Sequence, residues 1–349
     1  MLRKIFLTAL LLFLLLPASV PAQEPFYKGK TITIVNGLSP GGTGDMRVRA
    51  VVTFLRKYIP GEPTIVLEYM SGAGGRMAAN HIARSARPDG LTIGNVGGGL
   101  IGNAVLGQTG VQYDLNKLIY LGAPNSVTHY VFVTRKKAGL DTLQKLMSKA
   151  GVRIGAQAVG HDVYFNGRLF AYLIGLKEPK FVTGYSGPAI NAALMRGEVD
   201  ARASIADDIP RRTPEWLEKD LMNWHVIHEI PAGFRFRHPK FDPLPALHTF
   251  ARTELERTVL KMQINFRLVG SPYLLPPNTP KEQVKILREA FRKVFKDPEF
   301  FANMKKLTGA VAYPLVPEEQ EETVKQIPRD PEAIAAFRQL AGGDPLPSR

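Results

Sequence analysis

The chain has 349 residues, no cysteine and a formal net charge of +14 at pH 7. Without cysteine it has no disulfide framework, no thiolate nucleophile and no zinc–thiolate site, so an ordinary hydrophobic core must hold it together. The basic residues are dispersed along the sequence and are not interleaved with aromatic residues, which argues against a nucleic-acid-binding surface.

The N-terminal segment has the pattern of a secretory signal peptide. Arg3 and Lys4 precede an apolar run over residues 5–16, and small residues follow as far as Ala22. The run is shorter than the roughly 20 residues of a permanent transmembrane helix. We therefore expect residues 1–22 to be a signal peptide that is removed, and the mature chain to be a soluble periplasmic protein of two domains.

Three units of strand, glycine-rich loop and helix are predicted first along the chain, from runs of β-rich residues and apolar spacing near 3.6. The strands are expected at 31–35, 64–69 and 92–95, and the loops that follow them at 36–44, 71–75 and 97–99. The first helix is expected to begin at Asp45, acting as N-cap, with Arg49 as its partner one turn later. This alternation predicts an α/β fold.

A second set of α/β elements follows. Strands are expected at 130–134, 153–156, 180–183 and 201–205, and helices lie between them. Residues 231–245 show no period and predict a loop. Further on, Thr279 and Glu282 predict a capping box with Pro280 at the first helical position. The helix that follows should bury Val284, Leu287, Phe291 and Val294 on one face.

The glycine loops predict an anion-binding site. Glycine loops that lead from a strand into a helix expose backbone N–H groups near the positive end of the helix dipole. The loops of consecutive units share a crevice at one edge of a sheet. No loop is followed by Lys and Ser or Thr, as a Walker loop requires, and none has the Rossmann spacing, which argues against a nucleotide.

Catalytic and metal-binding motifs are missing from the sequence. The seven histidines have no metal-ligand spacing, and there is no Gly-x-Ser-x-Gly elbow, paired-carboxylate motif or catalytic lysine motif. We therefore expect no metal and no cofactor, and a binding protein instead of an enzyme.

The motifs, in their order, resemble the substrate-binding proteins of tripartite tricarboxylate transporters, the Bug-type periplasmic family. Residues 32–35 with Gly41, Gly42, Asp45 and Arg49 are similar to the first strand, glycine loop and helix start of that family. A second similarity consists of Glu68, the Gly-Ala-Gly-Gly of residues 72–75 and the Pro-Asp-Gly-x-Thr turn of residues 88–92. Later similarities are found at Gly155, Val159, Gly160, Gly167, Tyr185, Gly187 and residues 197–200.

The resemblance implies a two-lobed periplasmic binding protein of type II, a Venus-flytrap whose lobes are joined by crossing strands and close on a ligand in the cleft between them. Residues 28–124 plus 245–349 would form the first lobe, and residues 125–244 the second. Backbone amides, hydroxyls and ordered waters would hold a ligand carboxylate. A two-subunit membrane permease of the tripartite tricarboxylate type would receive the ligand from a monomeric protein. One alternative is a sensing module whose partner is a sensor kinase. The other is an exported enzyme that uses the same cleft.

The expected ligand-binding residues lie in loops on both sides of this cleft. In the first lobe they are Leu38, Ser39, Gly41, Gly42, Thr43, Asp45, Gly72, Ala73, Gly74, Gly75, Arg76, Gly97, Gly98, Gly99 and Asn103. In the second lobe they are Val159, Gly160, His161, Asp162, Tyr185, Ser186, Gly187 and Ser204.

Five of these positions depart from the pattern of the family and are expected to decide which acid is bound. They are Arg76, His161, Asp162, Ser186 and Ser204. An arginine near the cleft could grip a second carboxylate through two nitrogens, so Arg76 is the candidate for that contact. The alternative is that Arg76 is a solvent-exposed residue at the start of a helix.

Overall fold

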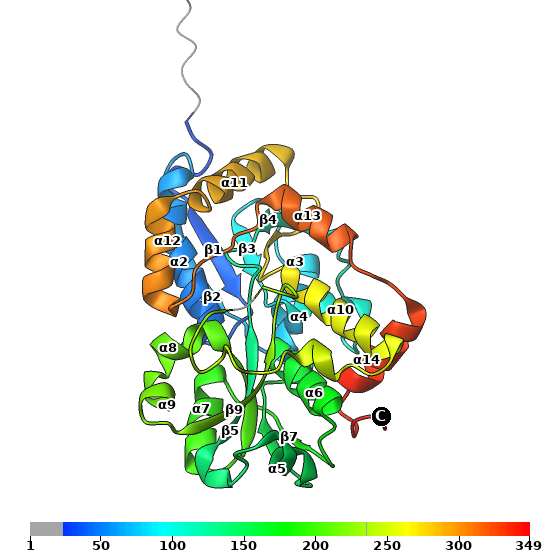
Figure 1. Ribbon diagram of the computed structural model, residues 1–349. Coiled ribbons are helices and arrows are strands. Elements are labelled where there is room, and N and C mark those ends of the chain that lie inside the picture. Colours follow the sequence, from blue (N-terminus) through cyan, green and yellow to red (C-terminus); the bar gives the residue numbers. More distant parts are fainter. Residues whose placement is uncertain (1–23, 235) are drawn as a thin grey trace, which may run out of the picture.

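The computed structural model describes residues 24–234 and 236–349, so the expected signal peptide lies outside the described residues. Within this part the chain forms two α/β lobes, one above the other in Figure 1, and each is built on a five-stranded sheet. Among the described helices, none combines the length and the apolar character needed to cross a membrane.

The sheet of the first lobe has the strand order β2-β1-β3-β10-β4. Strands β1 (Thr31–Asn36), β2 (Thr64–Tyr69) and β3 (Thr92–Asn95) are parallel, and β10 (Tyr273–Leu275) lies antiparallel between β3 and β4 (Ile119–Gly122). Its helices are α2 (Thr43–Tyr58), α3 (Arg76–Arg84), α4 (Gly99–Val105), α11 (Lys281–Val294), α12 (Pro298–Thr308) and α13 (Pro317–Lys325).

The second sheet has the order β7-β6-β8-β5-β9. Its strands are β5 (Tyr130–Arg135), β6 (Arg153–Gly155), β7 (Lys180–Val182), β8 (Ala201–Ile205) and β9 (Met222–His228). The helices of this lobe are α5 (Leu143–Ser148), α6 (Asp162–Ile174), α7 (Gly187–Arg196), α8 (Ile209–Arg212) and α9 (Pro214–Glu218). The four strands expected from the sequence in this lobe are present, and residues 236–246 contain no helix or strand.

Two predicted helix starts need correction. Helix α2 begins at Thr43, because extended Gly42 is the N-cap and Asp45 lies inside the first turn. Helix α11 is present and buries Leu287, but its capping box is absent. Pro280 is the N-cap there, and the hydroxyl of Thr279 instead donates to the Pro276 carbonyl oxygen at 2.8 Å.

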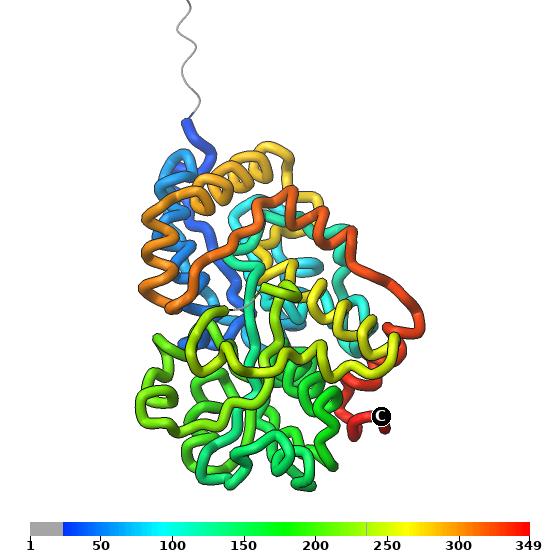
Figure 2. The backbone as a smooth tube through the Cα atoms, viewed as in Figure 1, coloured from blue at the N-terminus to red at the C-terminus, as the bar shows by residue number. Residues whose placement is uncertain are grey.

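Two segments carry the chain between the lobes, as Figure 2 shows. One runs from β4 to β5 and the other leaves the end of β9. The N–H of Thr128 in the first segment donates to the carbonyl oxygen of Ile230 in the second at 3.3 Å. The ring of His129 is held between the Asp207 carboxylate and the Phe234 carbonyl oxygen, both at 2.7 Å. These contacts tie the two connections together.

Apolar packing also joins the lobes, along helix α6. Helices α10 (Glu254–Leu268) and α14 (Pro331–Ala341) pack against each other, and α14 packs on α6. The ring of Phe337 stacks on that of Phe266, with 5.6 Å between the ring centroids. It also packs edge to face with the ring of Phe165, with 6.1 Å between the centroids. One hydrophobic cluster therefore runs from α4 in the first lobe to α6 in the second. This packing fixes the body of α6, whose N-terminus faces the cleft.

Candidate functional site

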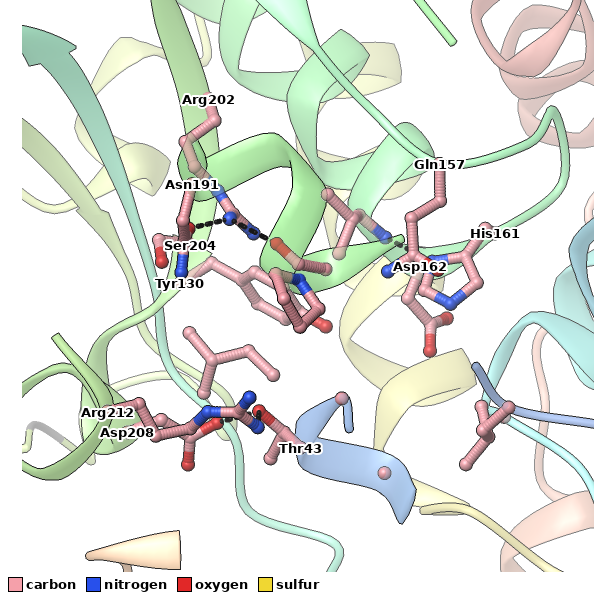
Figure 3. Close-up of a pocket in the computed structure, with 18 of the residues that line it drawn as sticks. Thr43, Tyr130, Gln157, His161, Asp162, Asn191, Arg202, Ser204, Asp208 and Arg212 are labelled. Carbon is pink, nitrogen blue, oxygen red and sulfur yellow. Dashed lines mark hydrogen bonds between the residues drawn. The ribbon is translucent and has the colours of Figure 1, made fainter. Parts of the chain in front are cut away.

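The cleft between the lobes contains two adjoining pockets. The first, here called the arginine pocket, has a volume of about 110 Å³ and is lined by Arg47, Arg202, Arg212 and Arg267 together with Thr43, Tyr130 and Asp208. Figure 3 labels Arg202, Arg212, Thr43, Tyr130 and Asp208 among these residues. The second, here called the glycine pocket, has a volume of about 350 Å³ and is lined by Gly37, Gly72, Gly74, Gly75 and Tyr185. Gln157 and His161 line both pockets, so the two spaces meet at these side chains.

The glycine pocket is formed by the loops that follow β1 and β2. These strands are parallel neighbours, so their loops leave the sheet at the same edge. Gly74 and Gly75 have left-handed backbones, with φ of +67° and +93°, a conformation that glycine adopts without strain. The loop leads directly into α3, and there the N–H groups of Gly75 and Arg76 donate to the carbonyl oxygens of Gly72, at 2.8 Å, and Ala73. On the side of the first lobe, the wall of this pocket therefore consists of backbone and small side chains.

The carboxylate of Asp45 holds the first glycine loop in shape. It is buried and accepts hydrogen bonds from the Gly41 N–H at 2.9 Å, the Tyr69 hydroxyl at 2.7 Å and Arg49 Nε at 3.0 Å. Burial acts to raise the pKa of Asp45, but these donors outweigh it and lower the pKa. The predicted pairing with Arg49 is present, and the carboxylate is directed at the protein, outside both pockets.

His161 is the N-cap of α6 and faces both pockets. Its Nδ1 accepts a hydrogen bond from the N–H of Val163 at 3.1 Å, so the proton of the neutral ring lies on Nε2. Burial lowers the pKa of the ring below its ordinary value, which favours this neutral form. The Nε2 N–H is therefore the hydrogen-bond donor of this ring. Ser186 acts as N-cap of α7, because its Oγ accepts from the N–H of Ala189 at 3.3 Å. The hydroxyl of Tyr185 donates to Glu198, so its polar end is used outside the site.

Asp162 does not present a free carboxylate to the arginine pocket, because it forms a buried ion pair with Arg267. This pair joins α6 to α10. Gly98 lies against the Arg267 guanidinium, and Gly99 lies against the Gly160 carbonyl oxygen. These glycines let the chain segments approach closely, and neither of them lines either pocket.

Arg76 is placed differently from the expectation. Its Nη1 donates to Asn103 Oδ1 and to the Val159 carbonyl oxygen, both at 3.3 Å, while Asn103 Nδ2 donates to the Gly160 carbonyl oxygen at 3.2 Å. Arg76 lines neither pocket. Its guanidinium therefore bridges the two lobes in this structure and is not directed at the space where a second carboxylate would sit.

The structure brings 14 of the 23 expected residues to the walls of the two pockets. The arginine pocket contains Leu38, Gly42, Thr43, Gly97, His161, Asp162, Gly187 and Ser204. The glycine pocket contains Ser39, Gly72, Gly74, Gly75, Tyr185 and Ser186, and shares His161. The expected residues outside both are Gly41, Asp45, Ala73, Arg76, Gly98, Gly99, Asn103, Val159 and Gly160.

A set of polar side chains lines the arginine pocket and was not expected from the sequence. They are Arg47, Tyr130, Gln157, Asn191, Arg202, Asp208, Arg212 and Arg267. A signal existed for Arg47, since it precedes Val51 by four residues and Leu55 by eight and so lies on the apolar face of α2. A guanidinium buried on that face needs a hydrogen-bonding or anionic partner, either in the protein or in a bound ligand.

Burial changes the acid–base properties of this pocket. It lowers the pKa of Arg202 to about 10, although the side chain stays cationic at neutral pH. Burial also raises the pKa of Asp208 to about 6, against the opposing effects of Arg47 and Thr43. Both changes reflect a medium in which isolated charges are costly and a bound counter-ion is strongly favoured. Within the described residues, no group of three or more His, Asp or Glu side chains could hold a metal ion.

Solved structures with the same fold are periplasmic binding proteins. BugD is 18% identical with a TM-score of 0.68, covering 90% of this chain and 98% of its own. MatC from Rhodopseudomonas palustris, solved with bound malate, is 21% identical with a TM-score of 0.65. The match covers 90% of this chain and 99% of MatC. Another Rhodopseudomonas palustris protein, solved with adipate, is 17% identical with a TM-score of 0.66. That match covers 89% of this chain and 96% of the other.

These Bug-type neighbours, together with a TctC solute-binding protein from Polaromonas at a TM-score of 0.54, belong to the group that the sequence motifs resemble. The chain therefore has the two-lobed fold of periplasmic binding proteins that was expected. No protein-family model matches the sequence, and the comparison with curated proteins found no match either.

Proposed function

We propose that this protein is a periplasmic solute-binding protein that captures a small carboxylate in the cleft between its lobes. A two-subunit membrane permease of the tripartite tricarboxylate type would then receive the ligand. The observation that carries the proposal is the glycine pocket, where the glycine-rich loops of the first lobe and the neutral His161 ring of the second line one space. Backbone N–H groups and a neutral imidazole N–H suit a carboxylate without needing an opposite full charge.

The fold and its neighbours support the same proposal. MatC with malate and the protein with adipate share this architecture. Ligand capture would be a shift of population from an open cleft to a closed one, and the permease would read the closed form. We place the first lobe at residues 28–124 plus 245–349 and the second at 125–244, with export directed by residues 1–22.

The test is a thermal-shift screen of residues 23–349 against a library of carboxylates, followed by calorimetric titration of each hit. A ligand present at 100 times its Kd should stabilise the fold by about 2.7 kcal/mol, because it binds only the folded state. Nuclear magnetic resonance of the bound acid after release should show it chemically unchanged. A screen without any stabilising acid, or an acid consumed by the protein, would contradict the proposal.

A further inference from the structure

The arginine pocket is lined by more guanidinium groups than carboxyl groups. Among the residues that the structure describes, four guanidinium groups line it, and the carboxyl groups that line it are those of Asp162 and Asp208. Asp162 is already paired with Arg267. Three guanidinium groups, those of Arg47, Arg202 and Arg212, therefore face a single remaining carboxyl group.

Arg47 is the least compensated of these groups. It is 4% exposed, and its Nε and Nη2 atoms are buried without a hydrogen-bond partner in the described part of the chain. A guanidinium cannot escape the cost of burial by losing its proton at neutral pH. An orphaned cation of this kind is expected where a ligand supplies the opposite charge.

Arg202 presents a second buried cation, held in place by neutral partners. It is 5% exposed and donates to the side-chain oxygen of Asn191, to the Gly187 carbonyl oxygen at 3.2 Å and to the Ala203 carbonyl oxygen at 3.1 Å. Figure 3 shows its guanidinium turned toward Asn191 at the wall of the pocket. Within the described residues, neither Arg202 nor Arg47 forms an ion pair with a carboxylate.

We infer that Arg47, supported by Arg202, forms a second anion subsite, and that the natural ligand carries two anionic groups. This inference rests on the proposed function. One carboxylate would lie in the glycine pocket and the other in the arginine pocket, and the chain of the ligand would pass Gln157 and His161, which line both. Arg47, and not Arg76, is thus the residue that selects a dianion.

The test compares acids of equal length in calorimetric titrations of residues 23–349. Succinate, glutarate and adipate are paired with butyrate, valerate and hexanoate. We expect at least one diacid to bind at least about tenfold more tightly than its monoacid, the effect of hydrogen bonds to a charged partner. Equal affinity in every pair would overturn the inference while leaving the proposed function intact. Failure of every acid to bind would overturn both.

Arg47→Met separates a ligand contact from a structural role. The variant should weaken the preferred diacid by about tenfold or more and change the monoacid by less than about threefold. Ligand-free Arg47→Met should melt at nearly the same temperature as the wild type, because the buried Nε and Nη2 atoms have no hydrogen bond to lose and the attraction to the Asp208 carboxyl is offset by the cost of burying the charge. Arg47→Lys, which keeps the charge, should restore part of the diacid affinity.

The matched control is Arg56→Met, on the same helix but exposed to solvent. It should leave the affinities for both acids unchanged. Equal weakening of monoacid and diacid by Arg47→Met, or a lower melting temperature with unchanged diacid affinity, would show that Arg47 only supports the fold.

Discussion

Gly74 and Gly160 lie in direct contact across the cleft, one from each lobe. A side chain on Gly74 would place its Cβ atom 2.7 Å from the carbonyl carbon of Gly160 and 2.8 Å from the N–H nitrogen of His161. Gly99 reaches the same segment and lies against the Gly160 carbonyl oxygen. The glycines of the first lobe thus shape the ligand site and also let the two lobes touch.

Gly74→Ala should therefore block closure of the cleft. We expect a folded protein that loses about 1–2 kcal/mol of stability from its left-handed φ and gains no thermal stabilisation from the preferred acid. Gly139→Ala is the control, because Gly139 has a similar φ of +71° but open space around its Cβ position. It should lose comparable stability and keep the full response to ligand. An unchanged response in Gly74→Ala would contradict the assignment of this contact.

Thr43 connects the start of α2 to the second lobe. Its hydroxyl donates to Asp208 Oδ2, and its oxygen accepts from Arg212 Nη1 at 3.1 Å (Figure 3). Thr43→Val keeps the shape and removes both bonds, so affinity for the preferred acid should fall by about tenfold. Small-angle X-ray scattering of the ligand-free variant should show a larger radius of gyration.

The control for this substitution is Thr53→Val, on the exposed face of the same helix. It should change neither the affinity nor the scattering profile. If Thr43→Val behaves like this control, the contact with Asp208 does not contribute to closure.

His228 should make the protein sensitive to acid. Burial lowers the pKa of His228 from its ordinary value of 6.5 to about 3, whereas the unfolded chain binds a proton near pH 6.5. Stability should therefore fall as the pH falls from about 6.5 towards 3, by up to about 3 kcal/mol at pH 4.5. Chemical denaturation of His228→Asn at pH 7 and 4.5 should show a smaller difference than in the wild type. The control is His81→Asn, a partly exposed histidine of the first lobe, which should retain the full difference.

Much of the fold follows from local sequence patterns. The strands at 64–69, 92–95 and 201–205 have the bounds that were expected, because β-branched runs and turn residues mark both ends. The capping box that the sequence predicts at the start of α11 does not form. Thr279 has the right spacing to Glu282, yet Pro280 occupies the cap and the hydroxyl turns to the preceding bend. Motif spacing alone does not determine which way a side chain rotates.

The glycine pocket was predictable and the arginine pocket was not. Glycine loops after parallel strands meet at one sheet edge, which is a consequence of chain order. Arg202 is held by Asn191, Gly187 and Ala203 of its own lobe, and the pocket around Arg202 and Arg47 forms only when residues of both lobes meet. The same tertiary contact decides the position of Arg76, whose partner Val159 lies far along the chain. Arg76 was expected to grip a ligand carboxylate, and its contacts with Asn103 and Val159 instead direct it away from both pockets.

Strand β10 completes the first sheet from a segment that lies far along the chain. The strands of the second sheet, β5 to β9, follow one another without interruption between residues 130 and 228. The first sheet lacks the strand between β3 and β4 until residues 273–275 are available. A chain that is synthesised from its N-terminus can thus form every strand of its second sheet while β3 and β4 still have open edges. Open strand edges can pair with other chains, so β3 and β4 are exposed to wrong pairing until β10 is present.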